Sequence, residues 1–378
     1  MTAMRDWLRH TAEIRERRGI IRHADRVARV DQSLDLASND YLGLATDPRL
    51  RAAAIRAIER DGTGAQASRV VTGTVSAHLE LEQELCALTG QPAALVFSSG
   101  YLANLAILTA LGRPGAVIIT DQHIHASLID AARLSRAAVE TVPHNDLDEL
   151  RATLSRRGAQ RAIVVVESIY SVLGDACDLR ATAALCAELD ALLVVDEAHG
   201  VGVIGGGRGA VHAAGLAGAE HVVLTATMSK ALGAQGGAVL GPSVLREHLV
   251  NTARSFIFDT GLAPAAAGAA AQACRIVLAE PERVAAVGRN AAIIAGGCGV
   301  TRAAGAVQSL PVRSPEAAAL IADRLRESGV LVGCFRPPSV PDGVSRLRLT
   351  ANAAHEPAQL TRATDLVLAA VRDEAAGP

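Results

Sequence analysis

Lys230 is the residue of this chain whose chemistry is hardest to replace. The 378 residues include 37 basic side chains, and Lys230 is the single lysine among them. Arginine stays protonated and cannot form a Schiff base, whereas a lysine amine can lose its proton and attack a carbonyl carbon. A surface lysine is the ordinary alternative. Because TATMSKALGAQGG puts Lys230 between an expected strand and a glycine-rich turn, we predict a nucleophilic amine in a cleft at the strand end.

Asp196 and His199 follow the most apolar strand that the sequence predicts, in LLVVDEAHG. A carboxylate at such a position can bind the protonated nitrogen of a pyridine ring and make that ring an electron sink. A helix cap or a metal ligand is the alternative interpretation. Metal binding needs further ligands, and the sequence has no HExxH motif or comparable spacing. We therefore expect no metal site.

Two other segments place polar groups after expected strands. FSSGYLANL puts residues 98–101 at the start of a helix, where backbone N–H groups can hold a phosphate, although many α/β turns look similar. His125, in DQHIHASL, is well placed to cover a ring at the sheet edge. A histidine with a purely structural role is the alternative.

The segment GVGVIGGG carries the strongest rival signal. Gly200, Gly202 and Gly205 have the G-x-G-x-x-G spacing, with Glu220 about 20 residues further on, which is the fingerprint of a dinucleotide site. Against this interpretation, polar residues separate the strand from the first glycine, and further glycines disfavour a helix there. An NAD-dependent Rossmann dehydrogenase is thus the less favoured alternative.

Composition limits the other classes of function. Half the residues are apolar, 20% are charged and the formal net charge is −2, which indicates a globular chain without the basic excess that draws nucleic acid or an anionic membrane surface. Six cysteines without CxxC pairs indicate reducing conditions and hence a cytoplasmic protein. The charged N-terminal segment does not resemble a signal peptide. The uncharged run 85–112 contains proline and polar residues, so we expect a strand, a turn and a helix rather than a membrane span.

Short apolar runs alternate with helical patterns from about residue 93 to 240. The expected strands are AALVF, AVIIT, VETV, AIVVVE, ALLVVDE and HVVLTAT. This alternation predicts an α/β fold with a largely parallel sheet covered on both faces, whose ligands bind at the carboxyl ends of the strands. Longer helices are expected at 242–255 and 264–295, followed by a smaller α/β unit. We expect an N-terminal arm at 1–40, a large domain at 41–278 and a small C-terminal domain at 279–378.

Assembled in order, these segments resemble the pyridoxal-phosphate-dependent α-oxoamine synthases. The resemblance runs from about Leu34 to the last helix and rests on SNDYLGL, FSSGYLAN, HASL, HND, VDEAHGVGV, TMSKALGAQGG, FIFDTGLAP and RPPSVPDGVSRLRLT. Several long motifs in the same order make it specific. It implies the type I fold of PLP-dependent transferases, which is aspartate-aminotransferase-like, and a homodimer with active sites shared between the subunits.

The resemblance also implies roles for individual residues toward pyridoxal 5′-phosphate (PLP). Lys230 is expected to form the Schiff base with the cofactor, and Asp196 to bind its ring nitrogen. His125 is expected to stack on the ring, while His199 and Ser171 flank its O3′ and its ring.

The residues expected to bind the cofactor or its phosphate are Gly100, Tyr101 and Thr227, with Thr260 reaching the phosphate across the dimer. Arg348 is expected to clamp the carboxylate of the amino acid, a bidentate task suited to guanidinium, and Thr350 to lie near the acyl substrate.

The implied reaction is the decarboxylative condensation of L-alanine with a pimeloyl thioester, carried by CoA or acyl-carrier protein. Relatives in the family use glycine, as glycine C-acetyltransferase and 5-aminolevulinate synthase do, or serine. The RPPSVP segment looks most like that of the pimeloyl enzymes and favours alanine. A catalytically inactive binding subunit is disfavoured, because every core position is chemically intact.

Three positions depart from the pattern of the family. The N-terminal acyl-contacting arginine falls in GIIRHAD, which leaves Arg22 as the nearest substrate-binding residue. The glycine-rich segment reads AQASR, with Ala67, and Leu173 stands where the family has an acidic residue. Both changes bear on the thioester or its carrier while leaving the core chemistry intact.

Overall fold

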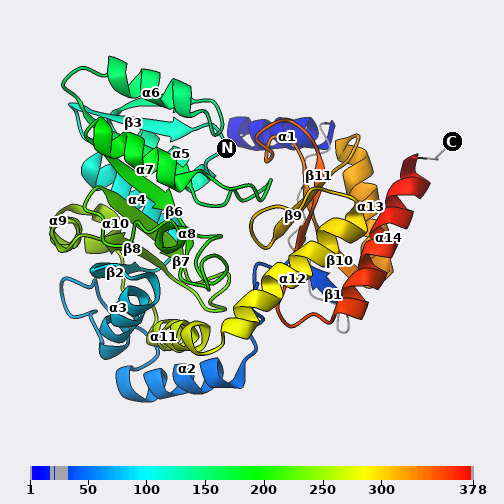
Figure 1. Ribbon diagram of the computed structural model, residues 1–378, viewed down its shortest axis with the longest axis horizontal. Helices are drawn as coiled ribbons and strands as arrows, with labels where there is room; N and C mark the ends of the chain where they lie inside the picture. The colour runs from blue at the N-terminus through cyan, green and yellow to red at the C-terminus, as the bar shows by residue number, and fades with distance from the viewer. Residues whose placement is uncertain (1, 18–20, 22–32, 376–378) are drawn as a thin grey trace.

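The computed structural model describes residues 2–17, 21 and 33–375, which contain a seven-stranded and a four-stranded sheet (Figure 1). The larger sheet has the strand order β2-β8-β7-β6-β5-β3-β4. Its strands are β2 (Ala93–Phe97), β3 (Ala116–Asp121), β4 (Ala138–Val142), β5 (Arg161–Glu167), β6 (Ala191–Asp196), β7 (Val222–Thr227) and β8 (Gly237–Gly241). The largely parallel sheet is confirmed. Strand β8 runs antiparallel to both of its neighbours, β2 and β7. It was not predicted because GAVLG is short and bounded by glycines.

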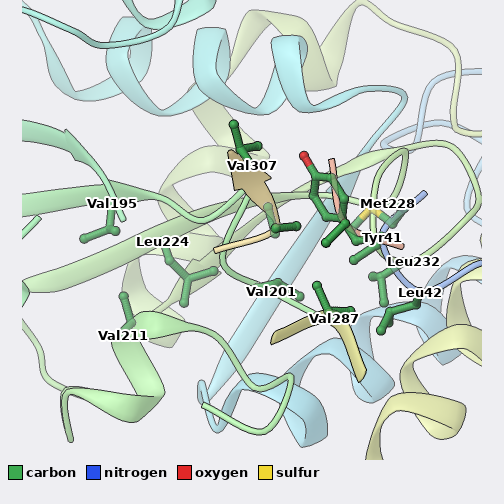
Figure 2. Packing of buried hydrophobic residues seen from close by; sticks show 14 of the residues in the cluster. Tyr41, Leu42, Val195, Val201, Val211, Leu224, Met228, Leu232, Val287 and Val307 are labelled. Carbon is green, nitrogen blue, oxygen red and sulfur yellow. The ribbon is translucent and has the colours of Figure 1, made fainter. Parts of the chain in front are cut away.

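Both faces of this sheet are buried, which explains why its strands are almost continuously apolar. Along β6, Leu193 and Val195 belong to one apolar cluster and Val194 to another on the opposite face. Figure 2 shows part of the first cluster, including Val195, Val211 and Leu224. The helices that carry residues of the second cluster are α4 (Gly100–Leu111), α5 (Ala126–Ser135), α9 (Ser243–Thr252) and α10 (Arg254–Ile257). Those of the first include α2 (Pro48–Asp61), α3 (Ser76–Thr89), α6 (Leu147–Arg156), α7 (Leu179–Glu188), α8 (Ala210–Ala213) and α11 (Pro264–Ala279).

The smaller sheet has the order β1-β10-β11-β9. Its strands are β1 (Leu34–Leu36), β9 (Val307–Pro311), β10 (Val330–Phe335) and β11 (Arg346–Thr350), and its helices are α12 (Pro281–Cys298), α13 (Pro315–Glu327) and α14 (Pro357–Ala375). The single helix expected at 264–295 is wrong. The chain forms α11 and α12 instead, because Pro281 has no N–H to continue a helix and begins the next one. In Figure 1, α12 starts beside α11 on the side of the large sheet and leads to the small sheet.

The N-terminal segment divides between two environments. Helix α1 (Thr2–Arg17) has no buried residue, whereas β1 pairs in parallel with β10 and so belongs to the small sheet. The residue bounds of the expected arm and domains stay a prediction. Within the described ranges, no helix is both long enough and apolar enough to cross a bilayer.

Candidate active site

A cavity of about 280 Å³ opens where β5, β6 and β7 end, beside the start of α4. Seven residues singled out from the sequence line it: Gly100, Tyr101, His125, Asp196, His199, Thr227 and Lys230. Sequence reasoning missed Asn104, Ser127 and Glu167, which line the same cavity. The parallel strands bring these distant segments together, as expected for the carboxyl edge of such a sheet.

Lys230 lies in the turn that follows β7, with its Nζ 2.9 Å from His199 Nε2. Burial lowers the pKa of Lys230 to about 8; the charges of Asp196 and Glu167 oppose this change, and that of Arg348 adds to it. An amine with this pKa is partly unprotonated near neutral pH. That form is the one that attacks a carbonyl carbon or removes a proton.

Asp196 is the last residue of β6 and is 6% exposed. Its Oδ2 accepts a hydrogen bond from Asn104 Nδ2 at 2.9 Å, and its Oδ1 accepts one from the backbone N–H of Ala198 at 2.8 Å. Asn104 also donates to Ser127 Oγ at 2.9 Å. These contacts fix a buried carboxylate on the cavity wall, where it can hold a cationic N–H group.

His125 caps the N-terminus of α5, which holds its ring at the cavity. Its Nδ1 accepts a hydrogen bond from the backbone N–H of Ser127 at 3.2 Å and lies 2.8 Å from Ser127 Oγ. Burial lowers the pKa of His125, against the charge of Asp196. A neutral, fixed imidazole can stack on a flat ring.

His199 is 5% exposed and makes contacts through both ring nitrogens. Its Nδ1 lies 2.7 Å from Tyr41 Oη, and its Nε2 faces Lys230. Burial lowers the pKa of His199 well below its ordinary value, and the charges of Lys230 and Arg348 lower it further. The ring is therefore neutral, with one nitrogen as donor and the other as acceptor.

The start of α4 provides the part of the cavity that suits an anion. Ser99 Oγ caps the helix by accepting from Leu102 N at 3.2 Å, and the first helical N–H groups lack partners within the helix. A Cβ added at Gly100 would lie 3.1 Å from Thr227 Cβ, so a side chain there would crowd the cradle. Thr227 Oγ1 lies 2.7 Å from Ser229 Oγ. Tyr101 is 42% exposed and donates to Asp130 Oδ2 at 2.5 Å.

Arg348 and Ser171 lie outside this cavity lining but contact each other. Arg348 Nε donates to the Ser171 carbonyl at 2.7 Å, and its Nη1 and Nη2 each donate to Asn39 Oδ1 at 3.1 Å. Arg348 is buried on β11, so the small sheet supplies this guanidinium. Thr350 on the same strand donates to the Ser38 carbonyl at 2.7 Å.

Thr260 does not line the cavity. Thr260 is exposed, although its neighbour Asp259 accepts a hydrogen bond from Ser98 Oγ at 2.5 Å. Arg22 lies outside the described residues. Their expected contacts stay predictions.

Glu167 could have been found in the sequence by the reasoning applied to Asp196, since it ends the run AIVVVE as Asp196 ends LLVVD. It is 2% exposed, and its Oε2 accepts from the Ser171 N–H at 3.2 Å. Its Oε1 is buried without a hydrogen-bond partner among the described residues. Asn39 and Tyr41, within SNDYLGL, had no chemical signal of their own.

The glycine-rich segment does not have the structure of a dinucleotide site. Gly202 and Gly205 have positive φ angles of 83° and 62°, and the helix that follows, α8, has only four residues. Its first N–H groups are already bound, because Glu197 accepts from Ala210 N at 3.1 Å and Val211 N at 2.6 Å. A buried carboxylate thus lies where a dinucleotide would place its pyrophosphate.

In the described ranges, no cluster of three or more His, Cys, Asp or Glu could hold a metal ion.

The donor set of the cavity fits PLP. The chain's lysine amine, a buried carboxylate at Asp196 and a helix N-terminus at Gly100 surround one space. They match the cofactor's aldehyde, ring nitrogen and phosphate in turn. His125 adds a flat ring beside them.

Comparison with known proteins agrees with this geometry. Residues 31–367 match the family described as aminotransferase class I and II. An 8-amino-7-oxononanoate synthase of Mycobacterium sp. (strain JLS) is 50% identical over 350 residues, 92% of each chain. A serine palmitoyltransferase from S. paucimobilis, solved with a PLP adduct of myriocin, has a TM-score of 0.87 at 31% identity and covers 91% of this chain and 89% of its own. An 8-amino-7-oxononanoate synthase from Francisella tularensis has a TM-score of 0.79 at 26% identity. It covers 92% of this chain and 100% of its own. The expected type I fold of PLP-dependent transferases is confirmed.

Proposed function

Since this chain belongs to the class I and II aminotransferase family, and within it to the 8-amino-7-oxononanoate synthases, we propose that it condenses L-alanine with a pimeloyl thioester and releases CO₂. The reaction is a step of biotin biosynthesis. The observation that carries the proposal is the position of the chain's only lysine, whose amine lies 2.9 Å from His199 in the same cavity as Asp196.

PLP is the cofactor, and when bound it supplies an electron sink for the negative charge that develops at the amino acid's Cα. Asp196 holds a proton at the ring nitrogen, an interaction supported by its burial and by its hydrogen bond from Asn104. Lys230 would hold the cofactor aldehyde, and its amine would serve as the base for the Cα proton. Its lowered pKa of about 8 supports this task, since a general base works best when its pKa lies near the working pH.

Other residues orient the bound groups. His125 would stack on the cofactor ring, and His199 and Ser171 would flank its O3′ and its ring. Gly100, Tyr101 and Thr227 bind the cofactor through the anion-binding start of α4 and the end of β7.

Arg348 binds the carboxylate that leaves as CO₂, with its guanidinium held by Ser171 and Asn39. Thr350 and Arg22 contact the acyl substrate. The thioester carrier is CoA or acyl-carrier protein.

We also propose that the enzyme is a homodimer in the cytoplasm. Phe258 and Val71 are 71% and 73% exposed, which supports an apolar contact surface near the segment that carries Thr260. In such a dimer Thr260 reaches the phosphate of the partner's site. The six cysteines are all free, which supports a reducing compartment.

A panel of purified-enzyme assays tests the function. L-Alanine, glycine and L-serine are each combined with pimeloyl, acetyl, succinyl and palmitoyl thioesters of CoA, and with pimeloyl-acyl-carrier protein. We expect turnover with alanine and a pimeloyl thioester. Turnover with glycine alone would contradict the proposal and favour a different α-oxoamine synthase.

A further inference from the structure

The HND segment, residues 144–146, has no part in the site described above. His144 Nδ1 lies 2.9 and 3.1 Å from the two carboxylate oxygens of Asp121, at the end of β3, and its Nε2 lies 2.7 Å from Asp175 Oδ2. An ionised carboxylate can only accept, so the ring donates from both nitrogens and carries a positive charge. Burial favours the neutral form of the ring, but these hydrogen bonds raise the pKa of His144 to about 9.

The other two residues of the segment support the same contact. Asn145 has a positive φ of 55°, a conformation that asparagine adopts more readily than most residues. Its backbone N–H donates to Asp121 Oδ2 at 2.8 Å, and its Nδ2 donates to Asp175 Oδ2 at 3.2 Å. Asp146 caps α6, since its Oδ1 accepts from Glu149 N at 2.9 Å. The segment therefore joins Asp121 to Asp175.

Asp175 belongs to a short hairpin, residues 168–177. Its two arms pair through an isolated antiparallel bridge, and the backbone N–H of Tyr170 donates to the Asp175 carbonyl at 2.9 Å. The ring of Tyr170 also packs edge-on against that of His144, with 4.4 Å between the ring centroids. His144 thus contacts both arms of the hairpin.

The same hairpin holds the guanidinium group of Arg348. The Ser171 carbonyl accepts from Arg348 Nε at 2.7 Å, and the Gly174 carbonyl accepts from Ala304 N at 3.2 Å. Arg348 lies on β11 and Ala304 precedes β9, so the hairpin meets the small sheet at two points. Glu167 provides a second hold on the hairpin, because its Oε2 accepts from the Ser171 N–H at 3.2 Å. A shift of the hairpin would move the carbonyl that orients Arg348.

We propose that His144 is a positioning residue: by anchoring the hairpin to the end of β3, it sets the direction of the Arg348 guanidinium group. Bidentate binding of a carboxylate depends on the plane of this group, and the Nε–H bond to the hairpin fixes that plane. The inference rests on the proposed function, in which Arg348 binds the carboxylate of the amino acid.

Binding of L-alanine to the cofactor-loaded enzyme, followed by absorbance without any thioester, provides the test. Ethylamine is the matched ligand, because it has an amine but no carboxylate for Arg348 to bind. His144→Gln should weaken alanine binding about tenfold, as when one charge-assisted hydrogen bond loses its geometry. Ethylamine should bind as it does to the wild type. Equal weakening for both ligands, or none for alanine, would overturn the proposal.

A second variant removes the same contact from the side of the hairpin. Asp175→Ala leaves His144 paired with Asp121 and should give the same selective loss for alanine. Combining it with His144→Gln should cause no further loss, since both changes remove one contact, and additive losses would refute the shared route. His221→Gln is the control variant. His221 Nε2 lies 3.2 Å from the Ala183 carbonyl, outside the hairpin, so both ligands should bind normally.

Hydrogen exchange, measured by mass spectrometry on the cofactor-loaded protein, tests the effect on the hairpin directly. Residues 168–177 should exchange faster in His144→Gln than in the wild type, whereas β6 should not change. Unaltered exchange in the hairpin would contradict the proposal.

Arg348→Gln separates this inference from the proposed function. It should itself lose alanine binding selectively. Selective loss in Arg348→Gln but not in His144→Gln would refute only the role of His144. Without selective loss in Arg348→Gln, the proposed role of Arg348 would be wrong, and this inference with it. None of these measurements needs a thioester, so a failed turnover assay does not affect them.

Discussion

Glu167 and Asp196 are register partners at the ends of β5 and β6, so two carboxyl groups lie side by side at one edge of the sheet. Both line the cavity that contains Lys230. Burial raises the pKa of Glu167 well above its ordinary value, and the charge of Asp196 raises it further. Two adjacent buried carboxyl groups do not both ionise readily. Beside Asp196, the site therefore has a carboxyl group, that of Glu167, which tends to stay neutral.

Because Glu167 tends to stay neutral, amide substitutions of Asp196 and Glu167 should change the pKa of Lys230 by different amounts. Asp196→Asn removes the charge that most raises the pKa of Lys230, so the lysine should titrate below about 8 in that variant. Glu167→Gln should lower the lysine pKa less, because the carboxyl group it replaces is mostly neutral. NMR titration of the single labelled lysine measures both. A larger effect of Glu167→Gln would show that the charges are assigned the wrong way round.

Substitutions of Lys230 should separate charge from nucleophilicity. Lys230→Ala and Lys230→Arg should both lose the visible absorbance of cofactor-loaded enzyme, because no other lysine exists to form the Schiff base. Turnover should fall by about 10²–10⁴-fold or more in each. Spectra before and after addition of cofactor provide the measurement. Retention of the wild-type band by Lys230→Arg would refute the assignment, since arginine keeps the charge but has no amine that can lose its proton.

His144 should make the folded state less stable at alkaline pH. Burial favours its neutral form, yet its hydrogen bonds with Asp121 and Asp175, at 2.9 and 2.7 Å, raise the pKa of His144 to about 9. A pKa above the unfolded value of about 6.5 means that the stabilisation is complete below that pH and is lost as the pH rises through about 9. After allowance for solvent screening we expect a loss of about 1–2 kcal/mol.

Chemical denaturation between pH 6 and 10 measures this effect. His144→Gln should flatten the profile, whereas His221→Gln, which leaves Asp121 and Asp175 paired with His144, should reproduce that of the wild type. An unchanged profile in His144→Gln would remove His144 as the cause.

Gly200→Ala should destabilise the fold strongly. A Cβ at this position would lie 1.8 Å from Glu197 Oε2 and 2.7 Å from Ser168 Oγ. Glu197 is 0% exposed and holds the start of α8, so it cannot move without breaking its own hydrogen bonds. We expect a loss of about 3 kcal/mol or more in unfolding free energy.

Thermal and denaturant unfolding compare this variant with Gly296→Ala. A Cβ at Gly296, inside α12, meets nothing within 4 Å, so alanine there should be neutral or stabilise by up to about 1 kcal/mol. Equal stability of the two variants would contradict the packing described around Glu197.

Periodicity located most strands of the large sheet because these strands are buried on both faces and must be apolar throughout. Strand β8 was not predicted, because small residues replace the apolar signal there. One helix was predicted in place of α11 and α12, because a single proline divides an apolar pattern that continues across it. The dinucleotide motif was misleading because a spacing of glycines does not record which group occupies the helix start. In the folded chain, that group is Glu197.

The sequence by itself determined the type of chemistry. A single lysine in a chain that otherwise uses arginine, and polar residues directly after apolar strands, point to Lys230, Asp196, His199 and His125. These signals are local, since each depends on a residue type and the strand or turn next to it.

Only the tertiary structure decided which groups act on the lysine. Tyr41 and Asn39 follow β1 of the small sheet and Arg348 lies on its β11. Tyr41, which contacts both of these residues, meets His199 at the edge of the large sheet. Protonation in such a site depends on burial and on neighbours hundreds of residues away in sequence, and neither is encoded in the local pattern. The sequence therefore identifies the amine, and the packing of the two sheets decides whether it is free to react.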